Sequence, residues 1–523
     1  MDTDISQSPP SVINVAAHLR QMARTHPYKR AVVFPFGRDQ QGRVAYTHLT
    51  FRQLDIESDC LAAGLDSIGI SRGVRTILMV TPSLEFFTIV FALFKIGAIP
   101  VIVDPGMGVK RMLECLKETR AQAMIGIPKA HVLRVFSPSY FKTVTVTVTV
   151  GTRWFWGGTS LRQLRSQTWE PYPMAKTMCD EIAAILFTTG STGPAKGVFY
   201  THGVFDAQVR HIQARFGITP DDIDLASFPL FSLFDPALGM TAVIPDMDPT
   251  RPADADPKKI VEAIVNHGIT TLFASPALLN RVGRYGKEAD IKLPSLNRVI
   301  TAGAPASPDI VERFAGMLTD GAQIHTGYGA TEAMPVSVFG SDEILHTTRK
   351  LTEQGFGMCV GPPLSGVDVR IICINDGPIS TWTDDLAVPS GDIGEIIVRG
   401  EQVTSGYYNR PDDDALSKIK DGNTFWHRMG DLGWIDKKGR IWFCGRKSHR
   451  VITETQTLFT IPCEAIFNTH PKVFRSALVG IGPEGRKQPV ICVELEPGLR
   501  EDRQRFIREE LADLAKTSPM TEE

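Results

Sequence analysis

Short runs of β-branched and aliphatic residues alternate with helical patterns in the first part of the chain. The run Thr76–Val80 is followed by a predicted helix over 85–96, a strand over 99–103, a second helix near 109–118 and the run AMIGI. Strands separated by helices are typical of crossover units, which build mostly parallel sheets. The sequence therefore predicts an α/β fold.

The same alternation returns later, which predicts a second α/β lobe. Its segments are 260–268, 270–274, 276–282 and 297–303. The repeat TVTVTVTV at Thr143–Val150 has the period of two that a half-buried strand requires, and we interpret it as a strand and not as a low-complexity segment.

Glycine, aspartate and proline interrupt short strands from Val367 onward, which predicts a β-rich subdomain over about 365–445. We place the last domain boundary just after Gly445. The prediction is a large N-terminal domain, 1–445, with two α/β lobes and the β-rich subdomain. A small mobile α+β lid domain follows over 446–523; it ends in a helix over 503–514, and we leave open that it is incomplete.

Composition narrows the class of protein. The 56 basic and 58 acidic residues are mixed along the chain and give a net charge of -2, so we expect neither nucleic acid nor an anionic membrane as a partner. The apolar stretch 84–103 is interrupted by charged residues, glycine and proline, which argues against a membrane span. Eight scattered cysteines without a CxxC pair fit a reducing cytoplasm. We expect a cytoplasmic protein that acts on small molecules.

A glycine- and hydroxyl-rich loop directly follows the apolar strand EIAAILF. Its glycines allow tight turns whose N–H groups can face phosphate oxygens, and its hydroxyls and Lys196 add donors and positive charge. The spacing is not that of a P-loop, because Ala195 stands where the Walker pattern needs glycine. The alternative is a surface loop without a ligand. The predicted phosphate contacts are Thr188, Thr189, Gly190, Ser191, Thr192 and Gly193.

The loop sequence TTGSTGPAKGV resembles the phosphate loop of the adenylate-forming superfamily of acyl- and aryl-CoA ligases, luciferases and nonribosomal adenylation domains. Further motifs follow in that family's order: 328–332 resembles YGxTE, 394–400 resembles GELxIxG, 428–431 resembles [RK]TGD, and Gly445-Arg446 matches the GR at the hinge. The resemblance implies ATP-dependent activation of a carboxylic acid as acyl-AMP, with Mg²⁺ as cofactor and pyrophosphate as product.

The resemblance also implies roles for individual residues. Lys196, Thr188 and Glu332 are the expected catalytic residues, and Glu332 and Thr188 the expected metal site. Asp431 is expected to accept hydrogen bonds from both ribose hydroxyls, with Arg446 beside the same sugar. Tyr328 is expected to offer an aromatic face to adenine. The other expected nucleotide contacts are Gly303, Ala304, Pro305, Gly327, Gly329 and Thr331.

The chain departs from the family pattern in several places. Phe231 and Ser232, predicted with Gly329 to line the substrate pocket, stand where many relatives have an aromatic-His pair. The segment after the hinge, 450–463, lacks the glycine that lets CoA ligases approach the thiol, and the hinge position is Ser448. We expect the family's C-terminal lysine to lie beyond Glu523, with Lys516 as the alternative.

A narrower resemblance, carried by YGATEAMPV and the whole-chain pattern, is to the bacterial β-lactone synthetases of olefin biosynthesis. It implies a 2-alkyl-3-hydroxy fatty acid as substrate, whose own 3-hydroxyl attacks the acyl-AMP and so needs no second substrate. A conventional CoA ligase and a nucleotide-binding pseudoenzyme subunit stay open as alternatives. The expected partner is a hydrophobic carboxylic acid, and assembly with other pathway enzymes is left open.

Overall fold

The computed structural model describes residues 12–165, 170–187, 195–228, 231–496, 498, 504–518 and 521. The chain forms two compact units. Unit 1 comprises Met1–Thr301, Gly316–Ala322 and Glu401–Pro411, and unit 2 comprises Ala302–Ala315, Gln323–Gly400 and Asp412–Glu523. No helix in these described ranges is long and apolar enough to cross a membrane.

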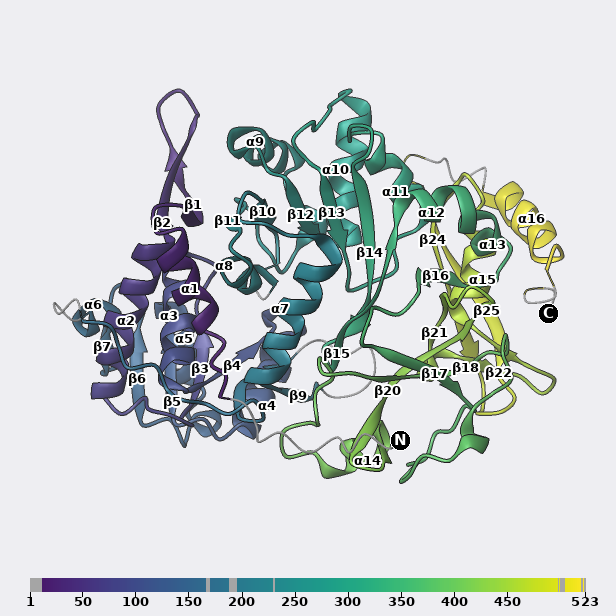
Figure 1. Cartoon of the computed structure of the whole chain (residues 1–523). Coiled ribbons are helices and arrows are strands. Elements are labelled where there is room, and N and C mark those ends of the chain that lie inside the picture. Colours follow the sequence, from purple (N-terminus) through teal and green to yellow (C-terminus); the bar gives the residue numbers. More distant parts are fainter. Residues whose placement is uncertain are drawn as a thin grey trace, which may run out of the picture. The chain divides into compact units, whose positions relative to one another are not determined.

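The first sheet of unit 1 confirms the crossover pattern and has the strand order β7-β6-β5-β3-β4-β8-β9 (Figure 1). All neighbours in it are parallel except the β8–β9 pair. Its strands are β3 (Arg75–Met79), β4 (Ile99–Val103), β5 (Ala123–Gly126), β6 (Val146–Thr149), β7 (Thr159–Ser160), β8 (Ile182–Phe187) and β9 (Gly197–Thr201). The predicted strand at 143–150 is thus real but shorter than predicted.

Helix α3 (Leu84–Ile96) is the buried helix expected from the sequence. Ser83 caps its N-terminus by accepting from the Phe86 N–H, and Gly97 ends it in a left-handed conformation. Every residue from Phe86 to Ile96 is buried. The other helices around this sheet are α1 (Ala17–Thr25), α2 (Phe51–Ser67), α4 (Val109–Glu118), α5 (Pro128–Phe136) and α6 (Leu161–Leu164).

A second sheet in unit 1 confirms the second α/β lobe, with the order β13-β12-β10-β11-β1-β2. Only the β1–β2 hairpin is antiparallel among these pairs. The strands are β1 (Arg30–Arg38), β2 (Val44–Thr50), β10 (Ile223–Ala226), β11 (Thr241–Val243), β12 (Thr271–Ala274) and β13 (Arg298–Thr301). The helices are α7 (His202–Phe216), α8 (Phe234–Leu238), α9 (Pro257–His267) and α10 (Pro276–Glu288).

Unit 2 contains the expected β-rich sheet, in the order β16-β21-β20-β18-β17 with β19 beside β20. These strands are β16 (Met358–Gly361), β17 (Asp368–Ile372), β18 (Gly394–Arg399), β19 (Lys418–Asp421), β20 (Thr424–Ile435) and β21 (Ile441–Arg446). A hairpin of β14 (Gln323–Ala330) and β15 (Ala333–Gly340) belongs to the same unit. Its helices before the C-terminal part are α11 (Pro308–Ala315), α12 (Ser341–Glu343), α13 (Arg349–Glu353) and α14 (Pro411–Ser417).

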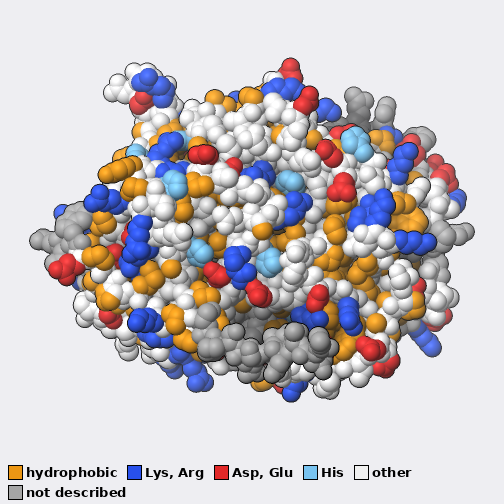
Figure 2. All heavy atoms as spheres, in the orientation of Figure 1, with side chains coloured by type: hydrophobic (Ala, Val, Ile, Leu, Met, Phe, Trp, Pro, Cys, Tyr) orange, Lys and Arg blue, Asp and Glu red, His pale blue; other side chains and the backbone are white. Residues whose placement is uncertain are grey.

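The C-terminal part of unit 2 is a small α+β region, as predicted. It contains β22 (Val451–Ile452), β23 (Thr457–Leu458), α15 (Thr460–Phe467), β24 (Val473–Ile481), β25 (Gln488–Leu495) and α16 (Gln504–Ala515). On the face of the molecule in Figure 2, basic and acidic side chains are interspersed, as the mixed composition suggests.

Candidate active site

The long strand β20 carries Asp431 in the middle of the unit 2 sheet. Gly430, directly before it, has a φ of +66°, a left-handed conformation that favours glycine, and the pairing of β18 with β20 is irregular beside it. The next strand, β21, ends at Arg446, which lies directly opposite Asp431 in the register. The glycine of the RMGD sequence therefore supplies the local backbone geometry from which Asp431 projects.

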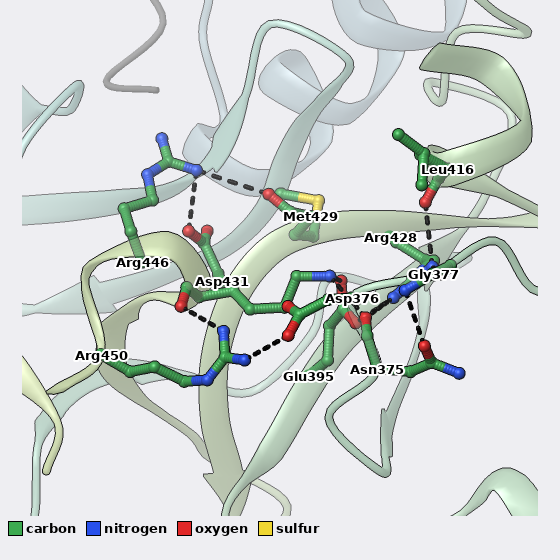
Figure 3. A network of polar contacts seen from close by, with 11 residues as sticks. Asn375, Asp376, Gly377, Glu395, Leu416, Arg428, Met429, Asp431, Arg446 and Arg450 are labelled. Carbon is green, nitrogen blue, oxygen red and sulfur yellow. Dashed lines mark hydrogen bonds and ion pairs between the residues drawn. The ribbon is translucent and has the colours of Figure 1, made fainter. Parts of the chain in front are cut away.

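Asp431 is a buried carboxylate held by two side chains. Its Oδ2 accepts a hydrogen bond of 2.9 Å from the Tyr328 hydroxyl, and its Oδ1 accepts one of 2.8 Å from Arg446 (Figure 3 shows the Arg446 contact). Burial raises the pKa of Asp431 to about 6, against the opposing effect of Arg446 and Tyr328. Each carboxylate oxygen can accept a second hydrogen bond, so the group keeps capacity for a ligand's hydroxyls.

Tyr328, Asp431 and Arg446 are thus three predicted nucleotide contacts that the structure brings together. Tyr328 was predicted to present its ring to adenine; the structure adds that its hydroxyl positions Asp431. The ring of Tyr328 also lies 6.0 Å from that of Phe443, centroid to centroid. Gly327 and Gly329 flank Tyr328 on β14. The predicted residues Gly303, Ala304 and Pro305 form an exposed turn of the same unit, before α11.

The β14–β15 hairpin places Thr331 and Glu332 at its tip, because Ala330 pairs with Ala333. The Glu332 charge acts on Asp431 and on Lys418, a residue that the sequence reasoning missed because no motif surrounds it. Burial lowers the pKa of Lys418 to about 7, while Glu332 and Asp414 oppose that shift.

Glu332 fits a magnesium site of the kind that a nucleotide completes. Mg²⁺ is usually bound by one or two carboxylates together with phosphate oxygens and water, and not by an all-protein cage. Among the described residues, no group of three or more His, Cys, Asp or Glu side chains is arranged to hold a metal. Glu332 is the described carboxylate that could bind such a metal together with the phosphates of a nucleotide.

An ionic cluster around the buried pair Arg428–Glu395 contacts the segment at the predicted hinge (Figure 3). Arg428 and Glu395 are both fully buried and pair at 2.7 Å, and Lys447 reaches the other oxygen of Glu395 at 2.9 Å. Arg450 pairs with Asp376 at 2.5 Å and donates to the Lys447 carbonyl at 2.7 Å. The arginine of the RMGD motif and the glutamate of the GEIIVRG motif therefore have a structural role.

The segment after the hinge forms a hairpin without glycine. Val451 pairs with Leu458, and the turn between them is held by Thr453, whose hydroxyl accepts from the N–H groups of Thr455 and Gln456. A side-chain hydroxyl therefore holds this turn, which contains no glycine.

In unit 1, the predicted phosphate-loop residues Thr188, Thr189, Gly190, Ser191, Thr192 and Gly193 lie outside the described residues. Lys196 follows that gap directly before β9, and its Nζ lies 4.9 Å from the centre of the Tyr407 ring. Tyr407 is held against β9 by a bridge to Val198 and by the hydrogen bond from the Tyr408 N–H to the Gly197 carbonyl.

Phe231 and Ser232 begin a short turn that packs among aromatic side chains. The Phe231 ring stacks on Phe273 at 4.3 Å, and Ser232 is buried. Two buried acids lie close by: Asp224 accepts from the Phe273 N–H at 3.2 Å and interacts with Asp235. Burial raises the pKa of Asp224 to about 7 and that of Asp235 well above its usual range.

His202 is a structural residue. It is buried, its Nδ1 accepts from the Val15 N–H at 3.2 Å, and burial lowers its pKa to about 4. A ring that accepts through Nδ1 and stays neutral holds the chain's N-terminal segment against α7 and has no catalytic geometry.

Comparison with known proteins agrees with this geometry. A family model described as AMP-binding enzyme matches residues 19–408. The chain belongs to the AMP-binding enzyme family. Within it, the chain is 46% identical to the olefin beta-lactone synthetase of Xanthomonas campestris pv. campestris, over 94% of this chain and 88% of that protein. It is 47% identical to the olefin beta-lactone synthetase of Stenotrophomonas maltophilia, over 93% and 88%.

The fold of the family is also seen in the solved structure of O-succinylbenzoate coenzyme A synthetase from Bacillus subtilis in complex with ATP and magnesium ion. The TM-score is 0.73 at 20% sequence identity, covering 94% of this chain and 92% of that chain. The predicted superfamily, fold class and AMP-forming ligase activity of this AMP-binding enzyme are thereby confirmed.

Proposed function

We propose that this AMP-binding enzyme is an olefin β-lactone synthetase. It uses ATP and Mg²⁺ to activate a 2-alkyl-3-hydroxy fatty acid and then closes the acyl-AMP to a β-lactone. The observation that carries the proposal is the identity of 46–47% over nearly the whole chain to two proteins of that name. That a protein of the same fold binds ATP and magnesium supports the choice of nucleotide and metal.

The nucleotide's sugar is assigned to Asp431. With one hydrogen bond already accepted at each oxygen, the carboxylate has two further lone pairs for the two ribose hydroxyls. Tyr328 and Arg446 hold the carboxylate in place, so it needs little reorganisation when the nucleotide binds. The ionised form is required, and it predominates above the raised pKa of about 6.

We assign the stabilisation of negative charge at the reacting phosphate to Lys196 and Glu332. Mg²⁺ bound at Glu332 would neutralise phosphate charge, and Lys196 would add a cation from the end of the phosphate loop. The substrate carboxylate forms the new bond to the α-phosphorus, and the bond to pyrophosphate breaks. The protein's contribution is positioning and charge stabilisation, with no covalent intermediate on a side chain.

The second step is assigned to the substrate itself. The oxygen of the 3-hydroxyl bonds to the acyl carbon, the bond to AMP breaks, and the hydroxyl proton passes to solvent water. A nucleophile on the same bound molecule has a high effective concentration, so no tunnel for a second substrate is needed. The post-hinge turn built on Thr453 without glycine supports this route over transfer to CoA.

A CoA-free incubation tests the proposal. Enzyme, ATP, Mg²⁺ and a 2-alkyl-3-hydroxy fatty acid are combined. The organic products are followed by NMR, and AMP is followed by chromatography. We expect β-lactone and AMP in equal amounts, and neither from Asp431→Asn. The matched acid without the 3-hydroxyl should give pyrophosphate but no lactone.

Turnover that begins only when CoA is added, with a thioester as product, would move the enzyme to the CoA ligases. ATP binding without any pyrophosphate release would instead favour the pseudoenzyme subunit.

A further inference from the structure

One edge of unit 1 carries an unbalanced positive charge, an exception to the mixed charge from which the sequence predicts no anionic membrane as a partner. Residues 121–165, which run from β5 to α6, contain no aspartate or glutamate. At the overall frequency of 58 acidic residues in 523, a stretch of this length would contain about five. The six basic residues of this stretch are Lys129, Arg134, Lys142, Arg153, Arg162 and Arg165.

The same stretch exposes aromatic side chains on the loop that follows β6. Trp154 is 58% exposed and Phe155 is 73% exposed. Their neighbour Trp156 is buried: it stacks on His131 of α5 at 5.4 Å. Trp156 thus anchors the loop and leaves the two preceding aromatics in solvent.

Further contacts make this loop a built feature of the edge. The Trp156 indole N–H donates to Thr149 of β6 at 3.0 Å, and Arg134 of α5 donates to the Trp156 carbonyl at 3.1 Å. Phe136, at the end of α5, is also exposed. The loop is therefore attached both to α5 and to the sheet, so Trp154 and Phe155 are held at a defined place.

Most of the basic side chains of this stretch are open to solvent. Lys129, Lys142, Arg153 and Arg162 are exposed, and Arg165 faces Glu57 of α2 at 3.5 Å. Strand β7 is the edge of the sheet, with β6 next to it (Figure 1). Residues 128–162, from the start of α5 to just after β7, form the α5–β7 edge.

We propose that the α5–β7 edge docks on an anionic phospholipid surface, with Trp154 and Phe155 entering the headgroup region. Tryptophan prefers the boundary between water and hydrocarbon because one side of its ring is apolar and its N–H is polar. Lysine and arginine near an anionic membrane each add a favourable interaction that salt screens. Two exposed aromatics are few for a stable protein interface, which buries a much larger area.

The docking proposal does not depend on the β-lactone reaction. If that reaction is correct, docking brings the enzyme to the surface where an apolar fatty acid accumulates. Binding to vesicles is measured without ATP or substrate. A negative result for docking therefore does not contradict the β-lactone reaction, and a negative result for the reaction does not contradict docking.

Flotation of the full-length protein with lipid vesicles tests the proposal. We expect binding to vesicles of phosphatidylcholine and phosphatidylglycerol, weak binding to phosphatidylcholine alone, and loss of binding as salt rises. Trp154→Ser with Phe155→Ser should abolish flotation, and Arg153→Gln should weaken it about fivefold. The control is Phe36→Ser, which removes an aromatic that is 78% exposed on the β1–β2 hairpin.

Three results would overturn the proposal: no binding to anionic vesicles at low salt, equal binding by the double variant, or equal loss in the Phe36→Ser control. A wild-type dimer in sedimentation velocity that the double variant converts to monomer would assign the edge to a second copy of the chain instead. If the double variant unfolds at the same temperature as wild type, its loss of flotation is not caused by misfolding. If the double variant is destabilised, Arg153→Gln is tested in its place.

Discussion

Replacing Tyr328 with phenylalanine should move the acid limit of activity to higher pH. The change removes a 2.9 Å hydrogen bond from a hydroxyl to the buried Asp431 carboxylate. A hydrogen bond to a charged group contributes about 1.5–3 kcal/mol, and one pKa unit corresponds to about 1.4 kcal/mol. The lost donor stabilised the ionised form, so the pKa of Asp431 should rise from about 6 by about one to two units.

The assay is pyrophosphate release as a function of pH, expressed as kcat/KM for ATP, because that ratio reports groups of the free enzyme. Wild type should lose activity as the pH falls through about 6, and Tyr328→Phe should lose it at a clearly higher pH. The matched control is Tyr140→Phe, which removes a tyrosine hydroxyl bonded to Glu114 at 3.2 Å in unit 1. An unchanged acid limb in Tyr328→Phe would refute the role given to this hydroxyl.

Three further changes have defined outcomes. Because the pKa values of Asp224 and Asp235 are raised in the folded state, the pair favours folding most below about pH 4, and its contribution falls as the pH rises towards 7. Asp235→Asn should therefore reduce the pH dependence of the free energy of unfolding, measured by urea unfolding at several pH values. Lys196→Ala should slow pyrophosphate release about 10²- to 10³-fold in single-turnover kinetics, with unchanged thermal unfolding. Gly445→Ala should lower the free energy of unfolding by at least about 2 kcal/mol, because the new Cβ would lie 2.2 Å from the Thr460 hydroxyl at a φ of +120°; chemical unfolding measures it.

Periodicity predicted the elements of unit 1 well because the signals are local. The strand over 99–103 has the predicted bounds, and α3 starts one residue before the predicted helix. The strand predicted over 143–150 shortens to Val146–Thr149 because its first residues do not join the ladder with β5. Alternation shows that a segment can be a strand, but only the length of its neighbour decides how much of it pairs.

The sequence predicted those residues of the candidate site that lie within recognisable motifs. Asp431 and Arg446, which are both predicted to contact the ribose, lie opposite each other on adjacent strands. The hydrogen bond from Tyr328 to Asp431 was missed because 103 residues separate the two and no local pattern links them. The Asp224–Asp235 pair was missed for a similar reason: burial makes it unusual, and burial is a property of the fold.

The two contacts around Ser448 differ in what would release them. Before it, Lys447 is tied to the buried Glu395 at 2.9 Å, where water and ions have little access. After it, Arg450 is tied to Asp376, whose side chain is 68% exposed, and exposed pairs of this kind contribute only about 0–1 kcal/mol. A strong contact at Lys447 and a weak one at Arg450 thus lie three residues apart, on either side of Ser448. Rising ionic strength should weaken the Arg450–Asp376 pair and leave the Lys447–Glu395 pair intact. Any rotation of the C-terminal part would therefore begin at Ser448.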